Sequence, residues 1–416
     1  MISSGACIVL LLAGCNVGPD YQRPAALASA AMPTAYAGDS SSMSGQWKTA
    51  QPSAHLPRGR WWKLFNDAEL NRLELLASAE NQQLSAAYAN FRQARALVNV
   101  TQADGFPQLA TAPGITRQRS NGGLSGGKSS TSNSFSVPLE ATWELDLWGR
   151  VRRQVEGAQA NLAASADDLE SAKLLVQAEV AIDYIMLRAL EEQRNLLQRT
   201  SKTYQRSLEL TQDRRAGGVA TDYDVSLAET QLRTTEAQVP ALTLQRANLM
   251  HALATLCGQT ATNFSINDAK SGLSAAPAIP VGVPSELLEQ RPDVAAAERR
   301  MAAANASVGV ASAAFYPRLT LSGNSGFQAS EATRLFNWSS RLWSVGPALN
   351  LPIFTGGRNS ASLAAARASY DASVANYRHT VLGAFQEVED QLAAQRLLTE
   401  QITAETAALN AARRTL

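Results

Sequence analysis

The sequence is poor in cysteine, in aromatic residues and in net charge. Of its 416 residues, three are cysteine (Cys7, Cys15 and Cys257), 6% are aromatic, and the formal net charge is +1. Three scattered cysteines exclude a disulfide framework and a cysteine-ligated metal site. A net charge near zero offers no basic field to nucleic acid. Few aromatic residues beside abundant alanine favour long, closely packed helices over a thick core.

The chain contains an internal sequence repeat. Phe106-Pro107 recurs as Tyr316-Pro317, and Gly149-Arg150 recurs as Gly357-Arg358 at an offset of 208 (357 − 149). Each copy carries two short strand-like segments and then a long stretch without proline. This duplication overrides the two or three globular domains that the length alone would suggest.

The segment from Phe135 to Leu147 alternates between apolar and polar side chains. One face takes Phe135, Val137, Leu139, Ala141, Trp143, Leu145 and Leu147, and the other takes Ser136, Pro138, Glu140, Thr142, Glu144 and Asp146. The second copy repeats the alternation between Trp343 and Ile353. Period two over about ten residues, with one oily and one polar face, is typical of a strand in a membrane β-barrel.

Each of these strands has a weaker partner, near 108–118 and 318–328. The segments Arg119–Ser134 and Ala329–Ser340 are rich in Ser, Gly and Asn and are expected to be the loops of two hairpins. Two hairpins give a sheet with open edges, which hydrocarbon does not tolerate because every backbone group must be paired there. The smallest barrels need about eight strands, so several chains must contribute, and three would supply about twelve. A soluble β-sandwich with one wet face stays open as the alternative.

The proline-free stretches predict helices too long for a globule. The first runs from Gly149 to about Ala216, roughly 100 Å at 1.5 Å per residue, and carries two apolar stripes. Gly217-Gly218 ends it, and Thr221-x-x-Asp224 predicts the N-cap of a return helix that ends near Gly258. The result is a helical hairpin whose tip is Gly217–Ala220. We expect Pro240 to bend or interrupt the return helix.

The N-terminus resembles a bacterial lipoprotein signal. An apolar run around Cys7 is too short to span a bilayer and leads into Leu12-Ala13-Gly14-Cys15, in which Cys15 would become the acylated first residue. Asn16 follows, and not the aspartate associated with retention at the inner membrane, so the outer membrane is expected. No Lys or Arg precedes the apolar run, so the true start codon stays open. Cys257 is expected to be a packed helix residue.

Two apparent motifs are weak. Gly122-x-x-x-x-Gly127-Lys128-Ser129 matches a phosphate-binding loop, but it lies in a segment that leads into a strand and not into a helix, so a hairpin loop is expected. His55, His251 and His379 have no metal-ligand spacing. Nothing in the sequence indicates a catalytic constellation, and the chain is not expected to be an enzyme.

The acidic residues of the strand near 135–147 allow two interpretations. Glu140, Glu144 and Asp146, with Thr142 between them, form a row along the polar face, where they would line a pore and favour cations. Alternatively, they pair with Arg150, Arg152 or Arg153 at the junction of strand and helix.

Several stretches resemble the outer-membrane factors of tripartite efflux systems, the NodT-type lipoproteins of the TolC superfamily. They are Gly18-Pro19-Asp20-Tyr21-x-x-Pro24, Trp61-Trp62-x-x-Phe65, Gly105-Phe106-Pro107, Asp146-Leu147-Trp148-Gly149-Arg150, Gly217-Gly218-Val219-Ala220-Thr221-x-x-Asp224-Val225, Glu289-Gln290-Arg291-Pro292-Asp293 and Pro352-Ile353-Phe354-x-Gly-Gly357-Arg358.

The resemblance implies a mainly helical chain with a small β part. Three copies would form a 12-stranded outer-membrane β-barrel that continues into a periplasmic α-barrel. The function implied is a passive exit duct for drugs and other small toxic compounds. The implied partners are a periplasmic adaptor protein and an inner-membrane RND-type pump, with no cofactor except the lipid on Cys15. The adaptor would meet the hairpin tip, Gly217, Gly218, Val219, Ala220 and Thr221. Arg214, Arg215, Asp222 and Asp224 are candidates for ion pairs that hold the tube shut.

The expected organisation follows the two copies. It begins with a signal peptide (1–14) and a lipidated extended, equatorial segment (15–66). A first repeat (67–258) follows, with a β-hairpin at 107–147 and a helical hairpin at 149–258. After an equatorial connection (259–283) comes a second repeat (284–416), with a helix at 291–314, a β-hairpin at 317–353 and a long helix at 358–416. Leu416 aligns with Leu208 (416 − 208), so the second helical hairpin is expected to be truncated by about fifty residues, and its gate residues cannot be named.

Two further hypotheses stay open at the level of sequence. One is a duct for protein secretion built on the same architecture. The other is a lipid-anchored coiled-coil structural protein without a pore.

Overall fold

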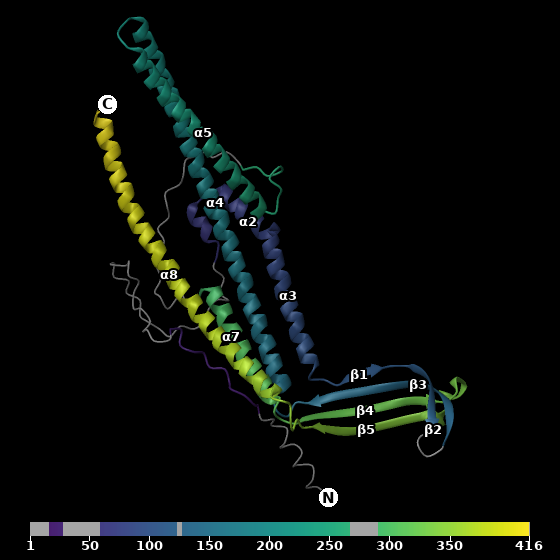
Figure 1. The fold of residues 1–416 in the computed structure, drawn as a ribbon. Coiled ribbons are helices and arrows are strands. Elements are labelled where there is room, and N and C mark those ends of the chain that lie inside the picture. The colour runs from purple at the N-terminus through teal and green to yellow at the C-terminus, as the bar shows by residue number, and fades with distance from the viewer. Residues whose placement is uncertain (1–15, 28–58, 123–126, 267–289, 416) are drawn as a thin grey trace. The chain divides into compact units, whose positions relative to one another are not determined.

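The computed structural model describes residues 16–27, 59–122, 127–266 and 290–415. They form two compact units. The first contains 16–27, 91–122, 127–166 and 293–415, and the second contains 59–90, 167–266 and 290–292. The structure is mostly helical with a smaller strand part, as the sequence predicts (Figure 1). The first sequence copy contributes to both units, because its two long helices α3 (Gln82–Ala103) and α4 (Arg150–Ala216) each run through the boundary.

The first unit contains an antiparallel sheet (Figure 1). Its strands are β1 (Gln108–Thr111), β2 (Gly114–Gly122), β3 (Gly127–Leu145), β4 (Arg318–Ala329) and β5 (Arg341–Asn350). The order is β1-β3-β4-β5, and β2 also pairs with β3. In the register, Leu145 lies opposite Leu319, and Leu319 lies opposite Leu349. Apolar residues therefore lie opposite apolar residues on neighbouring strands. This gives the sheet one apolar and one polar face, as the alternation predicts.

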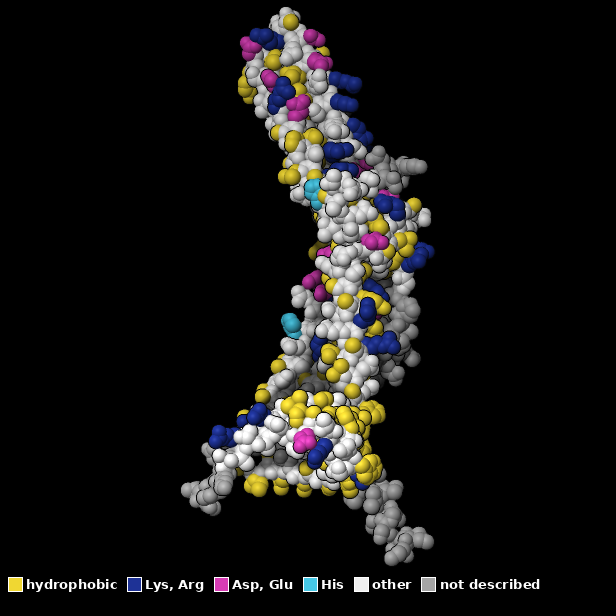
Figure 2. Space-filling view, turned by 90° about the vertical axis from the view of Figure 1, so that its right-hand side faces the viewer, with side chains coloured by type: hydrophobic (Ala, Val, Ile, Leu, Met, Phe, Trp, Pro, Cys, Tyr) yellow, Lys and Arg dark blue, Asp and Glu magenta, His cyan; other side chains and the backbone are white. Residues whose placement is uncertain are grey.

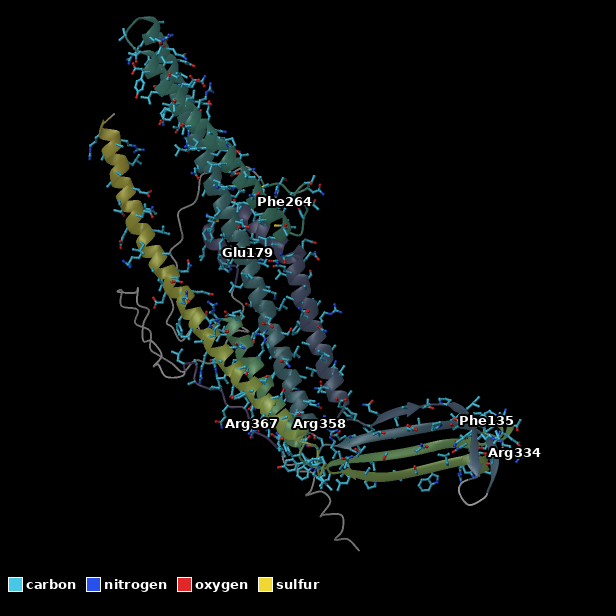
Figure 3. All side chains as sticks on the ribbon, in the orientation of Figure 1. Phe135, Glu179, Phe264, Arg334, Arg358 and Arg367 are labelled. Carbon is cyan, nitrogen blue, oxygen red and sulfur yellow. The ribbon has the colours of Figure 1, made fainter. Side chains whose placement is uncertain are left out.

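The sheet does not close on itself. β1 and β2 pair with β3 in one continuous register, in which Thr111 lies opposite Leu139 and Gly114 lies opposite Ser136, so they form a single interrupted edge strand. β5 is the other edge, and no strand among the described residues pairs with its outer side. Figure 2 views the sheet from its loop end, where hydrophobic side chains gather along its outer borders. Figure 3 places Phe135 and Arg334 at this loop end, away from the helices.

The prediction that Arg119–Ser134 is a loop is wrong for most of that segment. β2 continues to Gly122 and β3 begins at Gly127, so the hairpin extends well beyond the apolar alternation. Ser, Thr and Asn do not give the alternating pattern of a strand, yet antiparallel pairing satisfies their backbone groups equally well. Between Ala329 and Arg341 the chain forms the expected loop, with two short turns, η2 (Ala332–Arg334) and η3 (Trp338–Ser340).

The phosphate-loop pattern lies in this same hairpin. Gly122 ends β2, and Gly127 and Ser129 belong to β3, which runs antiparallel to β2. The pattern is therefore followed by a strand and not by the helix N-terminus that a phosphate site requires. Residues 123–126 lie outside the described residues.

The helices of the first unit pack closely. They are α7 (Pro292–Ala313), α8 (Arg358–Thr415) and the adjoining parts of α3 and α4. Gly157 of α4 lies against α7, where a Cβ atom would come within 3.5 Å of the Ala306 side chain. Val294, Met301 and Ala306 of α7 are fully buried. Figure 3 places Arg358 and Arg367 on the part of α8 that adjoins the sheet.

The second unit has its own core. It combines η1 (Trp61–Phe65), α2 (Ala68–Glu80), the rest of α4, and α5 (Asp222–Leu256) around Trp62, Leu73, Val180, Leu187 and Leu253. Asp67 caps α2 by accepting hydrogen bonds from the amides of residues 69 and 70, and it also accepts the Tyr184 hydroxyl of α4 at 2.8 Å. Cys257 is buried in this core as the C-cap residue of α5. Among the described residues, no helix combines the length and hydropathy that a transmembrane helix needs.

Pro240 does not interrupt α5. The helix runs unbroken from Asp222 to Leu256, with Pro240 inside it on an exposed face. Water can therefore hydrogen bond to the carbonyl that loses its amide partner, and the rest of the helix keeps its own bonds.

Candidate functional site

The polar face of the sheet carries the predicted strand residues. Glu140 and Thr142 of β3 are exposed, and they lie opposite Asn324 and Ser322 of β4 in the register. Glu144 belongs to the same face, and Asp146 follows directly after β3. The face therefore offers mostly hydroxyl and amide groups, with carboxylates toward the end that meets the helices.

Two of the three carboxylates are already paired at that end. Arg150 donates to both oxygens of Glu144, at 2.7 and 2.8 Å, and this hydrogen bonding raises the pKa of Arg150. Asp146 accepts the backbone amide of Arg152 at 2.9 Å and pairs with its side chain at 3.4 Å. The ion-pair interpretation thus describes Glu144 and Asp146, whereas Glu140 has no ion pair within the described part of the chain. Arg153 binds elsewhere.

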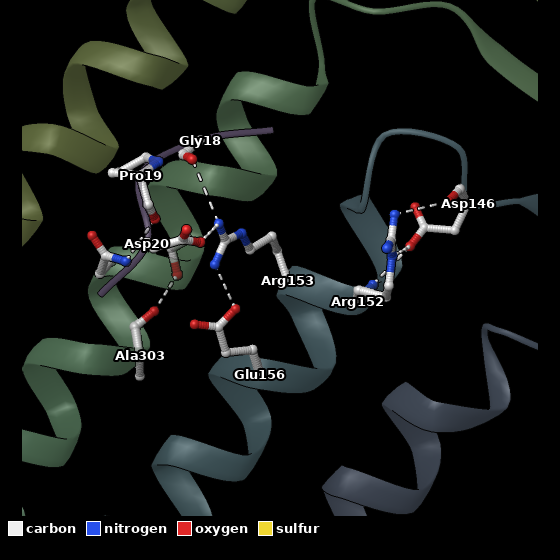
Figure 4. Close-up of polar contacts among 10 residues, drawn as sticks. Gly18, Pro19, Asp20, Asp146, Arg152, Arg153, Glu156 and Ala303 are labelled. Carbon is white, nitrogen blue, oxygen red and sulfur yellow. Dashed lines mark hydrogen bonds and ion pairs between the residues drawn. The ribbon is translucent and has the colours of Figure 1, made fainter. Parts of the chain in front are cut away.

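Arg153 holds the N-terminal segment 16–27 against α4 (Figure 4). Its guanidinium is buried and pairs at 2.7 Å with both Asp20 and Glu156, and it also donates to the carbonyl of Gly18. Burial lowers the pKa of Arg153, but these two partners outweigh it, and the net shift is upward. Asn305 of α7 donates to the carbonyl of residue 19 at 3.0 Å. The segment is therefore bound to two helices at once.

Further along, the same segment reaches α8. The Tyr21 hydroxyl donates to Glu298 of α7 at 2.5 Å, and burial together with this bond raises the pKa of Tyr21. Arg23 donates to the Tyr377 hydroxyl of α8 at 3.1 Å and lies over its ring. These contacts give a structural reason for the Asp20-Tyr21 motif, which in the sequence supports only a resemblance to the family and an expected equatorial position. The signal that could have found it was charged and hydroxyl-bearing residues in a segment without a helix or strand pattern.

The first described residue, Asn16, lies at the junction of β3 and α4. The amide of Val17 donates to the carbonyl of Trp148 at 3.1 Å. Gly149 has a positive φ of 79°, and a Cβ atom there would collide with the Asn16 side chain. Glycine thus makes room for the chain immediately after Cys15, which itself lies outside the described residues.

The tip of the α4–α5 hairpin is built by its own backbone. α4 ends in a Schellman motif, in which the amide of Val219 donates to the carbonyl of Arg214 at 2.8 Å and Gly218 adopts a φ of 75°. Thr221 and Asp224 form a capping box at the start of α5, as the sequence predicts. Val219 and Tyr223 are 81% and 73% exposed, so the tip presents apolar and aromatic surface to solvent.

The four charged residues predicted to form ion pairs at the tip differ in their contacts. Arg215 and Asp222 form an ion pair within the hairpin. Asp224 is used by the cap, and hydrogen bonds from the backbone and side chain of Thr221 lower its pKa. The exposed side chain of Arg214 has no ion pair among the described residues. Within the same limits, no three His, Cys, Asp or Glu side chains are grouped closely enough to hold a metal ion.

Comparison with known proteins identifies the family. A family model described as "Outer membrane efflux protein" matches residues 75–259 and 283–416. The chain belongs to the outer membrane efflux protein family. Outer membrane protein OprJ of Pseudomonas aeruginosa is 35% identical, over 99% of this chain and 84% of its own length. The probable outer membrane lipoprotein SilC of Salmonella typhimurium is 31% identical, over 98% of this chain and 86% of its own length.

The structural comparison agrees. The solved structure of the outer-membrane channel OprN superimposes with a TM-score of 0.83 at 32% identity, covering 94% of this chain and 85% of that one. The protein is therefore an outer-membrane efflux channel component of the TolC type, with a β-barrel part in the outer membrane and a helical part in the periplasm. The predicted family, fold class, function and location are confirmed. The family is one of channels and not of enzymes.

Proposed function

We propose that three copies of this chain assemble into one passive duct. It would carry drugs and other small toxic compounds from a tripartite pump across the periplasm and the outer membrane. The observation that supports this most directly is the sheet of the first unit. It has an oily and a polar face, and its two edges are unpaired within the described residues.

The unpaired edges of the described sheet support assembly from several copies. In hydrocarbon each unsatisfied backbone group costs several kcal/mol, so β5 of one copy must pair with the β1–β2 edge of the next. Each chain supplies four strand positions, so two copies reach only the smallest barrel size of about eight strands, which side chains fill. Three copies supply about twelve strands and leave room for water. The oily faces then turn to lipid and the polar faces line the lumen.

The test is the assembly state and conductance of the purified full chain. We expect a mass of three chains in native mass spectrometry and discrete conductance steps in planar bilayers. The same protein should restore drug resistance in a strain that lacks its own efflux channel. A stable monomer without conductance would leave only a structural role. Restored export of a protein reporter without restored resistance would indicate a secretion duct instead.

The proposed partners are a periplasmic adaptor and an inner-membrane RND-type pump, and the proposed docking surface is the tip Gly217–Thr221. Gly217 has room for a larger side chain, because only backbone oxygens at 3.6 Å or more lie near its Cβ position. Gly217→Trp should therefore preserve the trimer yet abolish efflux by blocking the adaptor. Gly383→Trp on α8, at a glycine with open space around it and no positive φ, is the matched control. Unchanged drug resistance in Gly217→Trp would remove the tip from the mechanism.

We further propose that the tip charges take part in closing the tube. Arg214 is the candidate for a bond to a neighbouring chain, since Arg215 and Asp222 pair within one hairpin. Arg214→Glu should raise the time-averaged conductance of the reconstituted trimer, whereas Arg233→Glu, on α5 outside the tip, should not. Equal conductance of the two variants and the wild type would exclude this role.

The proposed lipid on Cys15 fits the position of Asn16. The strand–helix junction is the place where the barrel leaves the membrane, so an acyl group one residue before Asn16 would reach the adjacent leaflet. Metabolic labelling with palmitate should mark the wild type and not Cys15→Ser. Labelling of both would place the lipid elsewhere.

A further inference from the structure

The lipid-facing surface of the sheet changes character along β3. Its apolar side chains extend from Leu145 to Phe135, which is the length that a membrane strand needs, about 9–11 residues. β3, however, continues to Gly127, and the next residues on the same face are Asn133 and Thr131. The end of the β2–β3 hairpin therefore projects beyond the hydrocarbon, on the side away from the periplasmic helices (Figure 3).

Three arginines lie on this face at its outer end. In the register Arg117 is opposite Asn133, Arg119 is opposite Thr131, and Arg341 is opposite Phe327. Ile115 pairs with Phe135 and Phe327 pairs with Val137, so all three arginines share the face of the oily band. All three side chains are exposed. Arg117, Arg119 and Arg341 are called the rim arginines below.

No carboxylate neutralises the rim arginines within the described part of the chain. Arg119 donates to the Ser129 hydroxyl at 3.3 Å, and Arg341 lies over the Trp338 ring at 3.5 Å from its centroid. The sequence from 112 to 138 contains no acidic residue, and from 322 to 348 it contains Glu331 alone. Glu331 pairs with Arg334 at 3.0 Å. The outer rim thus carries excess positive charge.

The height of Arg117 matches a layer of lipid headgroups, and Arg119 lies just beyond that layer, which its long side chain can reach. A strand rises about 3.4 Å per residue, or about 2.6 Å along the membrane normal at a tilt of about 40°. Arg117 and Arg119 therefore lie about 5 and 10 Å beyond Ile115. The headgroup region of one leaflet extends about 5–8 Å beyond the hydrocarbon. Trp338, which is exposed at the same end, has the amphipathic ring that is typical of this interface.

We propose that the rim arginines bind the phosphate groups of lipid A, the membrane anchor of lipopolysaccharide in the outer leaflet. Guanidinium groups bind phosphate through paired hydrogen bonds, more strongly than they bind neutral acceptors. The acyl chains of the same lipid would cover the oily band directly below. One lipid molecule would therefore satisfy the charge and the apolar surface that the chain leaves side by side. Phosphatidylglycerol, with one phosphate and fewer acyl chains, would bind less tightly.

The experiment measures lipid retention by the detergent-solubilised full-length protein in native mass spectrometry. The probes are bisphosphorylated lipid A, monophosphorylated lipid A and phosphatidylglycerol. We compare the wild type with a variant that combines Arg117→Ser, Arg119→Ser and Arg341→Ser. Each cation near an anionic surface contributes about fivefold in affinity, so the triple variant should bind bisphosphorylated lipid A at least about tenfold more weakly. The wild type should retain the monophosphorylated form and phosphatidylglycerol less well than bisphosphorylated lipid A.

The matched control is Arg334→Ser, which removes an arginine at the same end that Glu331 already neutralises. It should bind lipid A as the wild type does. A triple variant with Lys in place of Arg keeps the charge and should recover part of the affinity, and it tests the proposal if the serine variant does not fold. Equal retention of lipid A by the wild type and the serine variant would overturn the proposal. Displacement of lipid A by millimolar inorganic phosphate would also overturn it, because the site would then bind phosphate and not the lipid.

Discussion

Among single residues, Glu74 is in the least ordinary environment. Its side chain is completely buried in α2, and neither carboxylate oxygen has a hydrogen-bond partner. Burial alone raises the pKa of Glu74 to about 8, so the group is mostly protonated at neutral pH. A glutamate in a polar-looking stretch gives no sign of this in the sequence, because the core that encloses it also comes from α4 and α5.

This burial predicts a pH-dependent stability. The folded protein holds a proton that the unfolded chain releases above its ordinary pKa of 4.5. The free energy of unfolding should therefore fall as the pH rises from about 4.5 to about 8, by on the order of 4 kcal/mol, and then level off. Glu74→Gln cannot ionise, so its stability advantage over the wild type should be small at pH 5 and large at pH 9. Denaturant midpoints followed by circular dichroism at the two pH values measure this.

The control for Glu74 is an exposed glutamate of the same unit. Glu192→Gln on α4 changes the same charge in water, so its difference from the wild type should not grow with pH. If Glu74→Gln behaves in the same way, water reaches the Glu74 carboxylate and the burial argument fails.

At the scale of helices and strands, the sequence predicts the features that depend on residues close together in the chain. The apolar alternation identified β3 and β5 because each residue's face is set by parity, and Gly218, Thr221 and Asp224 fixed the turn between α4 and α5 because capping is a local event. The Ser-rich ends of β2 and β3 were missed, since their pairing depends on the partner strand and not on side-chain pattern. The contacts of the N-terminal segment could not be predicted from the sequence, because its partners lie more than a hundred residues away along the chain.

The N-terminal segment also supports a prediction. Arg153 is its main polar contact with α4, and its partners Asp20 and Glu156 are solvent-accessible and would not be left as buried charges. Arg153→Met should keep the helix packed through the length of its side chain while it releases the segment. Chymotrypsin should then cleave after Tyr21 about five- to tenfold faster, as expected for the loss of on the order of 1 kcal/mol of charge-assisted bonding. Peptide mass spectrometry over time measures the rate.

Arg150→Met is the control in the same helical turn, because the side chain of Arg150 bonds to Glu144 and Gln154. It should leave cleavage after Tyr21 unchanged. Equal acceleration in both variants would mean that general loosening of the junction, and not the Arg153 contacts, exposes the segment.

At the scale of the whole molecule, the charge on the proposed lumen depends on which carboxylates remain unpaired. The sequence pattern does not distinguish Glu140, Glu144 and Asp146, because their spacing along a strand does not show which of them a helix will approach. The turn into α4 brings Arg150 to Glu144 and Arg152 to Asp146, which neutralises both. Glu140 has no ion pair among the described residues, so in the proposed trimer three copies of it would form a ring of negative charge in the lumen.

This difference predicts shifts of the same direction but of different size from two similar substitutions. Glu140→Gln removes the free charge and should lower the cation preference of the channel. Glu144→Gln also removes one negative charge, but it releases the bound Arg150 as well, so the lumen near the junction becomes positive and the channel should shift further toward anions. Reversal potentials of the reconstituted trimer across a tenfold potassium chloride gradient measure both shifts. Glu331→Gln, in the outer loop between β4 and β5, should shift the potential less than either. If Glu140→Gln leaves the reversal potential unchanged while Glu144→Gln changes it, the polar face at Glu140 does not line the conducting path.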